Sequence, residues 1–154
     1  MKDITKIAPT MENAQCPLEG VATAAQPAEE HLTSLAEAGY RTVLDLRTPE
    51  EPRGFDEPEA VREAGMEYVG IPVSPETLDE ETFDRFREFV NDPVRRPVFV
   101  HCSSANRVGA LLLPYMVLDE DKSPEEATEL ARQIGLGSDD LEQKALDYTR
   151  SSQR

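Results

Sequence analysis

The chain has 154 residues, which is long enough for one domain with a buried core of its own. Its 31 Asp and Glu outnumber its 16 Lys and Arg and give a formal net charge of −15, so a nucleic-acid backbone or an anionic membrane surface would be repelled. We therefore expect neither nucleic acid nor membrane as a partner.

The cysteines and the N-terminus indicate a compartment. Cys16 and Cys102 are too few for a disulfide framework, and we interpret Cys16 as an incidental free thiol. The N-terminus lacks an apolar core of signal-peptide length, and no apolar run is long enough to cross a membrane. These features predict a cytoplasmic protein.

The segments along the chain predict a fold class. Residues 1–18 lack periodicity and are expected to form an arm, packed at the surface or disordered, before a single domain over residues 19–151. Strands are predicted over 20–24, 41–46, 66–73 and 97–100, and helices over 26–38, 57–64, 110–118, 123–134 and 139–150. A further helix is expected after a capping box of Thr77 with Glu80. The alternation predicts a three-layer α/β domain, with a central, mostly parallel sheet of four to five strands flanked by helices.

The stretch from Val98 to Ala110 carries the clearest functional signal. An apolar strand passes through a short polar turn into an apolar helix, and Cys102 lies in that turn five positions before Arg107. A helix N-terminus and a nearby cation both favour the thiolate form of a cysteine. A thiolate beside a guanidinium group predicts attack on, or transfer of, a phosphoryl or sulfur group.

The turn also predicts an anion cradle. The expected phosphate-binding residues are those whose backbone N–H groups follow the cysteine: Ser103, Ser104, Ala105, Asn106 and Arg107. Arg107 is expected to bind two equatorial oxygens of a phosphoryl group while Cys102 attacks phosphorus in line.

Two further residues are expected to support this turn. His101 directly precedes the cysteine and is predicted to fix its geometry by hydrogen bonding and to favour the thiolate. Asp45 lies near the carboxyl end of a predicted parallel strand, where ligands bind in α/β sheets. It either faces the site or makes structural hydrogen bonds.

His101-Cys102, with a loop that ends in Arg107, resembles the phosphate-binding loop of cysteine-dependent protein tyrosine and dual-specificity phosphatases. The likeness extends to Ala25-Gln26-Pro27 and to Ser123-Pro124. Within that superfamily the chain most resembles a small bacterial phosphatase-like group, often described as beta-lactamase hydrolase-like. The resemblance implies a protein-tyrosine-phosphatase-like fold and two-step hydrolysis of a phosphomonoester through a phosphocysteine. It implies no metal and no organic cofactor.

The loop departs from the family pattern in three ways. Four residues separate Cys102 from Arg107, where the better-known phosphatases have five. Val108 stands where a serine or threonine usually helps the thiolate to leave, and Ala105 is the nearest equivalent of the usual loop glycine. A tighter cradle and slow breakdown of the phosphocysteine are the expected consequences.

The general acid has two candidates. In the family an aspartate follows the preceding strand, but matching Ile71-Pro72-Val73 to that strand places Pro75 at its position. Glu76 and Asp79 are the nearby carboxylates, and either could instead be a solvated carboxylate favoured by the next helix dipole. Because an aryl phosphate tolerates a poor acid, the expected substrate is a phosphotyrosine protein or a small aryl phosphate.

Two other functions are compatible with the motif. A four-residue gap, together with Leu44-Asp45-Leu46-Arg47 and Pro49-Glu50-Glu51, also resembles the rhodanese-type sulfurtransferases, in which Cys102 would carry a persulfide. The third alternative is an inactive module that binds phosphate or a phosphoprotein. The histidine before the cysteine, and the helices after residue 123, favour the phosphatase.

Overall fold

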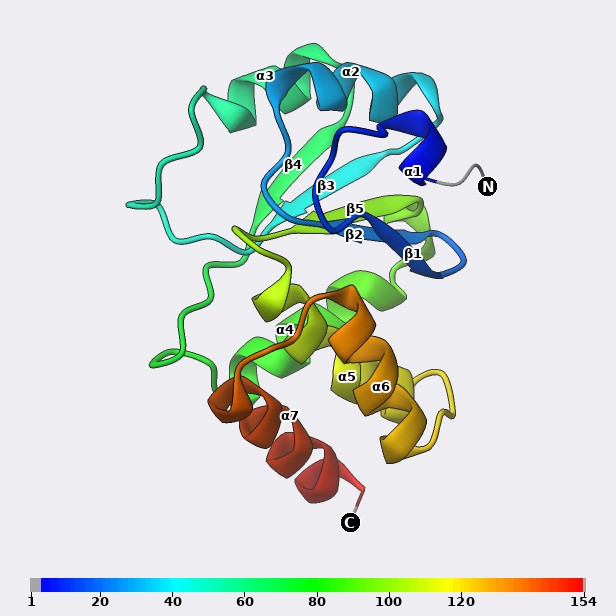
Figure 1. The fold of residues 1–154 in the computed structure, drawn as a ribbon, viewed down its shortest axis with the longest axis vertical. Coiled ribbons are helices and arrows are strands. Elements are labelled where there is room, and N and C mark those ends of the chain that lie inside the picture. The colour runs from blue at the N-terminus through cyan, green and yellow to red at the C-terminus, as the bar shows by residue number, and fades with distance from the viewer. Residues whose placement is uncertain (1–3, 154) are drawn as a thin grey trace.

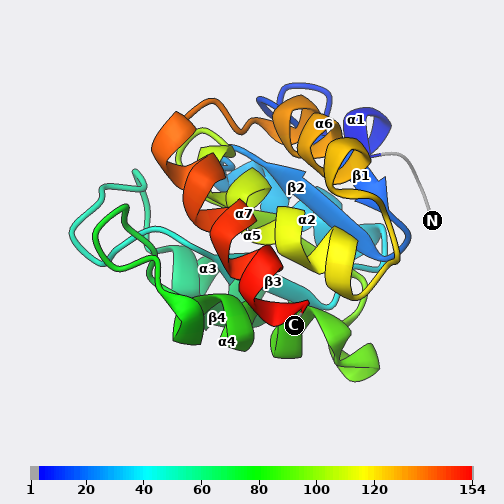
Figure 2. The same cartoon turned by 90° about the horizontal axis from the view of Figure 1, so that it is seen from below.

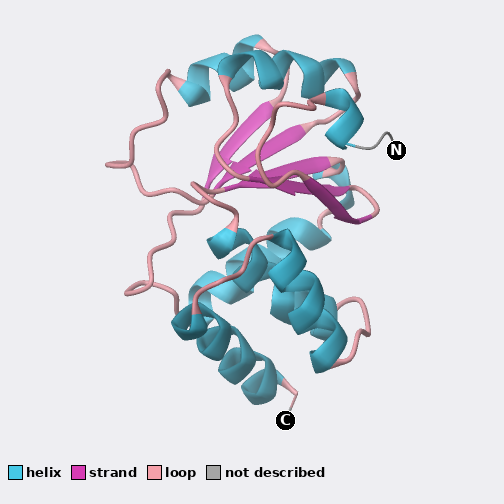
Figure 3. Cartoon of the chain, in the orientation of Figure 1, coloured by secondary structure: helices cyan, strands magenta, loops and turns pink. Residues whose placement is uncertain are grey.

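The computed structural model describes residues 4–153, and it shows one sheet between two layers of helices (Figures 1 and 3). The strands are β1 (Gln15–Leu18), β2 (Val21–Ala24), β3 (Thr42–Asp45), β4 (Glu67–Gly70) and β5 (Val98–His101). They pair in the order β1-β2-β5-β3-β4, with β1 antiparallel to β2 and all other pairs parallel. The predicted three-layer α/β domain with a mostly parallel sheet is confirmed.

Helices cover both faces of the sheet. One layer holds α1 (Ile4–Ile7), α2 (Glu29–Glu37) and α3 (Glu57–Glu63). The other layer holds α4 (Glu80–Asn91), α5 (Asn106–Leu118), α6 (Pro124–Ile134) and α7 (Asp139–Ser152). Figure 2 shows this layer in front of the sheet. A 3₁₀ turn, η1 (Pro93–Arg95), precedes β5. Among the described helices, none combines the length and the apolar character needed to cross a membrane.

Each face of the sheet has its own apolar core. Leu32, Leu35 and Phe99 belong to the core under α1–α3, whereas Phe86 and Leu111 belong to the core under α4–α7. Every residue of β2, β3 and β5 is buried, as expected for parallel strands covered on both faces. This double cover explains why these strands appear in the sequence as apolar runs without alternation.

The register of the strands places the polar turns together. Ala24, Asp45 and His101 are paired across β2, β3 and β5 at the carboxyl end of the sheet. The segments that follow these residues therefore leave the sheet at one edge. The loops after β3 and β4 protrude on this same side, at the left of Figure 1.

The N-terminal segment differs from the predicted arm. Residues 15–18 form an edge strand, and Ile4, Ala8 and Met11 are buried in the core under α2 and α3. The strand was hard to predict because its side chains are exposed or half-buried and because it contains Pro17, which edge strands tolerate. Residues 1–3 of the predicted arm lie outside the described residues.

The predicted helix caps have mixed outcomes. Ser123 and Ser138 cap α6 and α7, as their spacing predicts. The capping box of Thr77 with Glu80 is wrong, because Asp79 is the N-cap of α4 and its Oδ1 accepts from the Thr82 N–H at 3.0 Å. A competing local turn, in which Thr77 hydrogen-bonds with Ser74, explains the difference.

Candidate active site

The segment between β5 and α5 forms a tight loop around Cys102. Ala105 is the N-cap of α5 and has a φ of 73°, in the left-handed region that few residues other than glycine adopt. Gly135, after α6, packs against it, and a Cβ atom at position 135 would lie 2.8 Å from the Ala105 Cβ. The loop is therefore fixed from outside by the end of α6.

Two neighbouring segments hold the loop carbonyls outward. The Gln26 N–H donates to the Ser103 carbonyl at 3.3 Å, and Asn13 Nδ2 donates to the Ser104 carbonyl at 3.1 Å. In a trans peptide the next N–H points opposite to the carbonyl, so the N–H groups of Ser104 and Ala105 point away from these partners. This orientation suits an anion cradle.

Arg107 extends from the first turn of α5 and is held by Glu51. Glu51 Oε1 lies 2.7 Å from Arg107 Nη2, and Glu51 Oε2 lies 2.8 Å from Nη1. The hydrogen bonds that Arg107 donates to Glu51 raise the pKa of Arg107 against the opposing effect of burial, and the nearby Cys102 side chain adds to the rise. Arg107 therefore stays charged beside Cys102, as the motif predicts.

The remaining Arg107 donors define where an anion can bind. Nη1 also donates to the Val73 carbonyl at 2.9 Å, and Nη2 donates to the Ser103 hydroxyl at 3.0 Å. A guanidinium group has five N–H donors, and these contacts together with Glu51 use four of them. The Nε–H and the Nη2 N–H that contacts Ser103 form a second fork, which a phosphoryl group can bind if it displaces the hydroxyl.

Glu51 is itself held in a small polar cluster. Its carboxylate accepts from Arg47 Nε at 3.1 Å, and from the Thr48 N–H and hydroxyl at 2.6 and 3.0 Å. Arg107 foremost, and then the Thr48 N–H and Arg47, lower the pKa of Glu51 against the effect of burial. An ionised Glu51 thus pairs with Arg107 over the working pH range.

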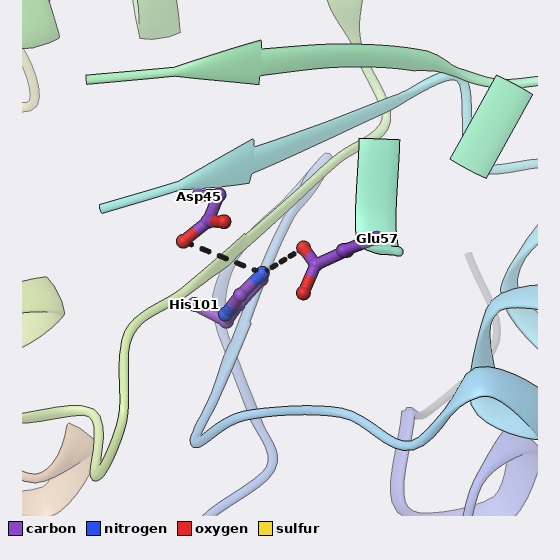
Figure 4. Close-up of side chains that lie close together, drawn as sticks. All are labelled: Asp45, Glu57 and His101. Atoms are coloured by element: carbon purple, nitrogen blue, oxygen red, sulfur yellow. Dashed lines mark hydrogen bonds and ion pairs between the residues drawn. The ribbon is translucent and has the colours of Figure 1, made fainter. Parts of the chain in front are cut away.

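His101 is buried and contacts the carboxylate of Glu57. The distance between His101 Nε2 and Glu57 Oε2 is 2.5 Å, and Asp45 Oδ1 lies 3.9 Å from the same nitrogen (Figure 4). On the other side of the ring, Nδ1 lies 3.4 Å from the carbonyl oxygen of Cys102. Glu57 therefore holds an imidazole that touches the backbone of the cysteine.

Asp45 makes structural hydrogen bonds at the strand end. Its Oδ2 accepts from Arg53 Nε and from the Tyr68 hydroxyl, both at 2.7 Å, and its Oδ1 accepts from the Arg47 N–H at 2.9 Å. Burial acts to raise the pKa of Asp45, but His101 and these donors together lower it. Asp45 is an ionised anchor for the loop after β3.

The carboxylates of Asp45 and Glu57, together with His101, are also potential metal ligands. Asp45, Glu57 and His101 each offer a ligand atom, and these atoms lie within 4.8 Å of one another. The positive Arg53 guanidinium already occupies Asp45 at 2.7 Å, and it would repel a cation there. The donor set fits a buried ion-pair network better than a metal site.

The two candidate acids lie in different surroundings. Glu76 is exposed in the loop before α4, and the Lys144 ammonium of α7 donates to the carbonyl of the adjacent Pro75. Asp79 is exposed and caps α4, and its hydrogen bonds from the Thr82 side chain and N–H lower its pKa. A lowered pKa favours the carboxylate over the protonated form that an acid requires.

Asn106, another predicted phosphate ligand, makes hydrogen bonds through its side chain. Its Oδ1 accepts from the N–H groups of Gly137 and Ser138, at 3.0 and 3.3 Å. Its side chain therefore faces the start of α7, and only its N–H group is left for the predicted cradle. Ser103 and Ser104 are exposed.

The chain matches one known protein family over most of its length. Residues 9–148 match the family described as "DSP-PTPase phosphatase fused to NAD+ Kinase". The chain belongs to this family. A curated relative in Xylella fastidiosa (strain 9a5c), a beta-lactamase hydrolase-like protein, is 28% identical over 142 residues. The match covers 87% of this chain and 33% of the relative, so the chain spans about a third of that relative's length.

Solved structures share the DSP-PTPase fold. A putative phosphatase (DUF442) from Shewanella putrefaciens CN-32 has a TM-score of 0.82 at 19% identity, over 96% of this chain and 97% of that one. The core catalytic domain of the PP-IP phosphatase SIW14 from S. cerevisiae has a TM-score of 0.77 at 18% identity, over 93% and 92%. A variant of TpbA from P. aeruginosa, in complex with pTyr, has a TM-score of 0.70 at 19% identity, over 90% and 83%.

Four polar residues around the loop of this DSP-PTPase family member were not predicted as site residues. Glu51, Glu57 and Arg47 lie on or after the loop that follows β3, and Gln26 follows β2. Gln26, Arg47 and Glu51 were noted only within stretches that resemble known families. A usable signal was that Gln26 and Arg47 each lie two residues after a buried parallel strand, β2 or β3, both of which pair with β5, since such residues meet at one sheet edge.

Proposed function

We propose that this chain is a cysteine-dependent phosphomonoester hydrolase in which Cys102 forms a phosphocysteine. The observation that carries the proposal is the placement of Arg107, whose guanidinium group is held by Glu51 at one fork, contacts the Ser103 hydroxyl through Nη2 and lies near the Cys102 side chain. The outward carbonyls of Ser103 and Ser104 add N–H donors. This is an arrangement that stabilises a transferring phosphoryl group through donors fixed in advance.

In the first step the Cys102 thiolate attacks phosphorus, and the bond from phosphorus to the leaving oxygen breaks. Arg107 and the loop N–H groups bind the equatorial oxygens as charge shifts. Glu76 donates a proton to the leaving oxygen. We favour Glu76 over Asp79 because the carboxylate of Asp79 is engaged in capping α4.

In the second step water attacks phosphorus and the S–P bond breaks, which releases inorganic phosphate and restores the thiolate. The ionised Glu76 accepts the proton of the attacking water. His101, supported by Glu57, holds the backbone of Cys102 through both steps. These steps involve only protein groups and water.

The proposed substrates are aryl phosphates, phosphotyrosine among them. A structural neighbour was solved with pTyr, and an aryl leaving group needs the least help from an acid. A cavity of about 440 Å³ is lined by Glu51 and other charged side chains and also by Phe55, Tyr68 and Pro72, whose rings can contact an aromatic group.

The test compares the wild type with Cys102→Ser on p-nitrophenyl phosphate and phosphotyrosine, with phosphoserine as the alkyl substrate. We expect phosphate release by the wild type, faster on the aryl substrates, and none by the variant. Sulfur transfer from thiosulfate to cyanide is measured in parallel. Sulfur transfer without phosphate release would overturn the proposal, and so would phosphate release that survives the substitution.

A further inference from the structure

Gln26, two residues after β2, contacts three parts of the candidate site at once. Its N–H donates to the Ser103 carbonyl at 3.3 Å. Its side-chain Nε2 donates to Glu57 Oε1 at 2.7 Å, and its Oε1 accepts from Arg47 Nη1 at 2.9 Å. The backbone therefore touches the phosphate loop, and the side chain links an anion to a cation.

These contacts connect His101, which precedes Cys102, with Arg107. From Gln26 one branch runs through Glu57 to His101, which touches the backbone of Cys102. The other branch runs through Arg47 to Glu51, which holds both arms of Arg107. A chain of side-chain hydrogen bonds thus connects the residue before the nucleophile with the arginine.

The network has a defined direction at Gln26. The amide nitrogen must face the Glu57 carboxylate and the amide oxygen must face the Arg47 guanidinium, since the reverse orientation would place like partners together. Glu57 is fully buried and Arg47 is nearly so, with 11% of its side chain exposed. Because these two side chains expose little surface to solvent, a lost contact has to be taken up by movement of the neighbours.

We propose that Gln26 is a positioning residue of the phosphate site, which sets the loop, Glu57 and Arg47 relative to one another. The proposal deepens the proposed function, on which it rests for its meaning in catalysis. Gln26 acts through these neighbours, so its loss lowers the organisation of the anion site and leaves the chemical groups present.

Gln26→Glu is the sharpest variant because it retains the size and the acceptor for Arg47 but opposes the Glu57 carboxylate with a second carboxylate. Gln26→Ala removes the side chain only. The matched control is Gln143→Ala, which removes an exposed glutamine of α7 whose amide bonds to Asp147. All variants are made in the full chain with Cys16→Ser, so that Cys102 is the one remaining thiol.

Three measurements are made on each variant: binding of inorganic phosphate by calorimetry, the rate of alkylation of Cys102 by iodoacetamide at fixed pH, and kcat and KM on p-nitrophenyl phosphate. We expect Gln26→Glu to weaken phosphate binding about tenfold and to lower kcat/KM about a hundredfold, with a changed alkylation rate. Gln26→Ala should change the same readouts less, and Gln143→Ala should change none.

Phosphate binding and alkylation separate this inference from the proposed function. If the wild type releases no phosphate but Gln26→Glu still weakens phosphate binding, the function fails and the positioning role stands. A folded Gln26→Glu variant with wild-type phosphate affinity and alkylation rate overturns the inference, whatever its thermal stability. If Gln26→Glu does not fold, the same result with Gln26→Ala overturns it.

Discussion

Glu51 holds Arg107 by both arms of its guanidinium group, with Oε1 2.7 Å from Nη2 and Oε2 2.8 Å from Nη1. The carboxylate comes from the loop after β3 and the arginine from the first turn of α5. A bidentate pair of this kind fixes the plane of the guanidinium group as well as its position. The plane decides which fork faces an incoming phosphoryl group.

We predict that Glu51→Gln lowers kcat/KM on an aryl phosphate about tenfold, because a neutral amide cannot accept from both arms and Arg107 loses its orientation. The measurement is steady-state kinetics at pH 7, with Glu50→Gln as the control at an exposed neighbouring position. Equal kinetics for the Glu51 and Glu50 variants would show that the plane of Arg107 is set without Glu51.

The same pair predicts a pH effect on stability. Arg107 foremost lowers the pKa of Glu51 from its ordinary value of 4.5, so the folded state favours the carboxylate. The stabilisation is complete above pH 4.5 and is lost as the pH falls from there toward the lowered pKa. Urea unfolding should therefore separate the wild type from Glu51→Gln most at pH 7 and progressively less below pH 4.5. A gap that widens on acidification would contradict the assignment.

Gly135→Ala should damage the loop, although position 135 is remote from it in sequence. The added Cβ would meet the Ala105 Cβ at 2.8 Å and the Ala105 carbonyl oxygen at 3.0 Å, and Gly135 has a φ of +148° that alanine rarely adopts. We expect a loss of about 1–3 kcal/mol in the free energy of unfolding and weaker binding of inorganic phosphate.

Gly137→Ala is the matched control for that variant. An added Cβ at position 137 meets no described atom within 4 Å, and its N–H can still donate to Asn106. Chemical denaturation and phosphate calorimetry on both variants should separate them. Similar losses at the two glycines would mean that contact with Ala105 is not the cause.

The two acid candidates should respond differently to substitution. Glu76→Gln should slow hydrolysis of an alkyl phosphate about a hundredfold and that of p-nitrophenyl phosphate much less, because a good leaving group departs without a proton. Asp79→Ala should instead lower the free energy of unfolding through the lost cap of α4. Kinetics on both substrates with urea unfolding tests this, and an alkyl-selective loss with Asp79→Ala alone would reverse the roles.

Arg107→Lys should be nearly inactive, with kcat on aryl phosphate lower by about 10²–10³. A lysine keeps the charge but cannot bind Glu51 and a phosphoryl group through two forks at once. Circular dichroism of the variant checks that the fold is retained. Activity within a few-fold of the wild type would show that charge alone is sufficient.

Strands, helices and caps were predicted correctly from the sequence wherever a single local pattern determined the structure. Apolar runs such as Val98-Phe99-Val100 and caps such as Ser123 predicted strands and helices to within a few residues. The sequence spacing of Cys102 and Arg107 predicted that the two side chains lie close together. β1 was missed because an edge strand needs no apolar alternation. At Thr77 two overlapping polar signals competed, and the tight turn formed instead of the helix cap.

The partners of Cys102 and Arg107 were beyond such rules. Glu51, Glu57 and Gln26 are polar residues in irregular segments or at a helix start, and nothing local distinguishes them from solvated surface residues. They meet only because three parallel strands end at one edge. Their identity depends on register and loop shape, which a single sequence specifies through the whole core rather than through a motif.

Helix α7 connects to both sides of the candidate site. Asn106, at the end of the phosphate loop, accepts from Gly137 and Ser138 at its start, and Lys144 in its middle donates to Pro75 in the loop of the proposed acid. Anyone who trims this domain out of a longer polypeptide should therefore keep all of α7, which ends at Ser152, since deleting the helix would remove contacts to the loops that hold Asn106 and Pro75.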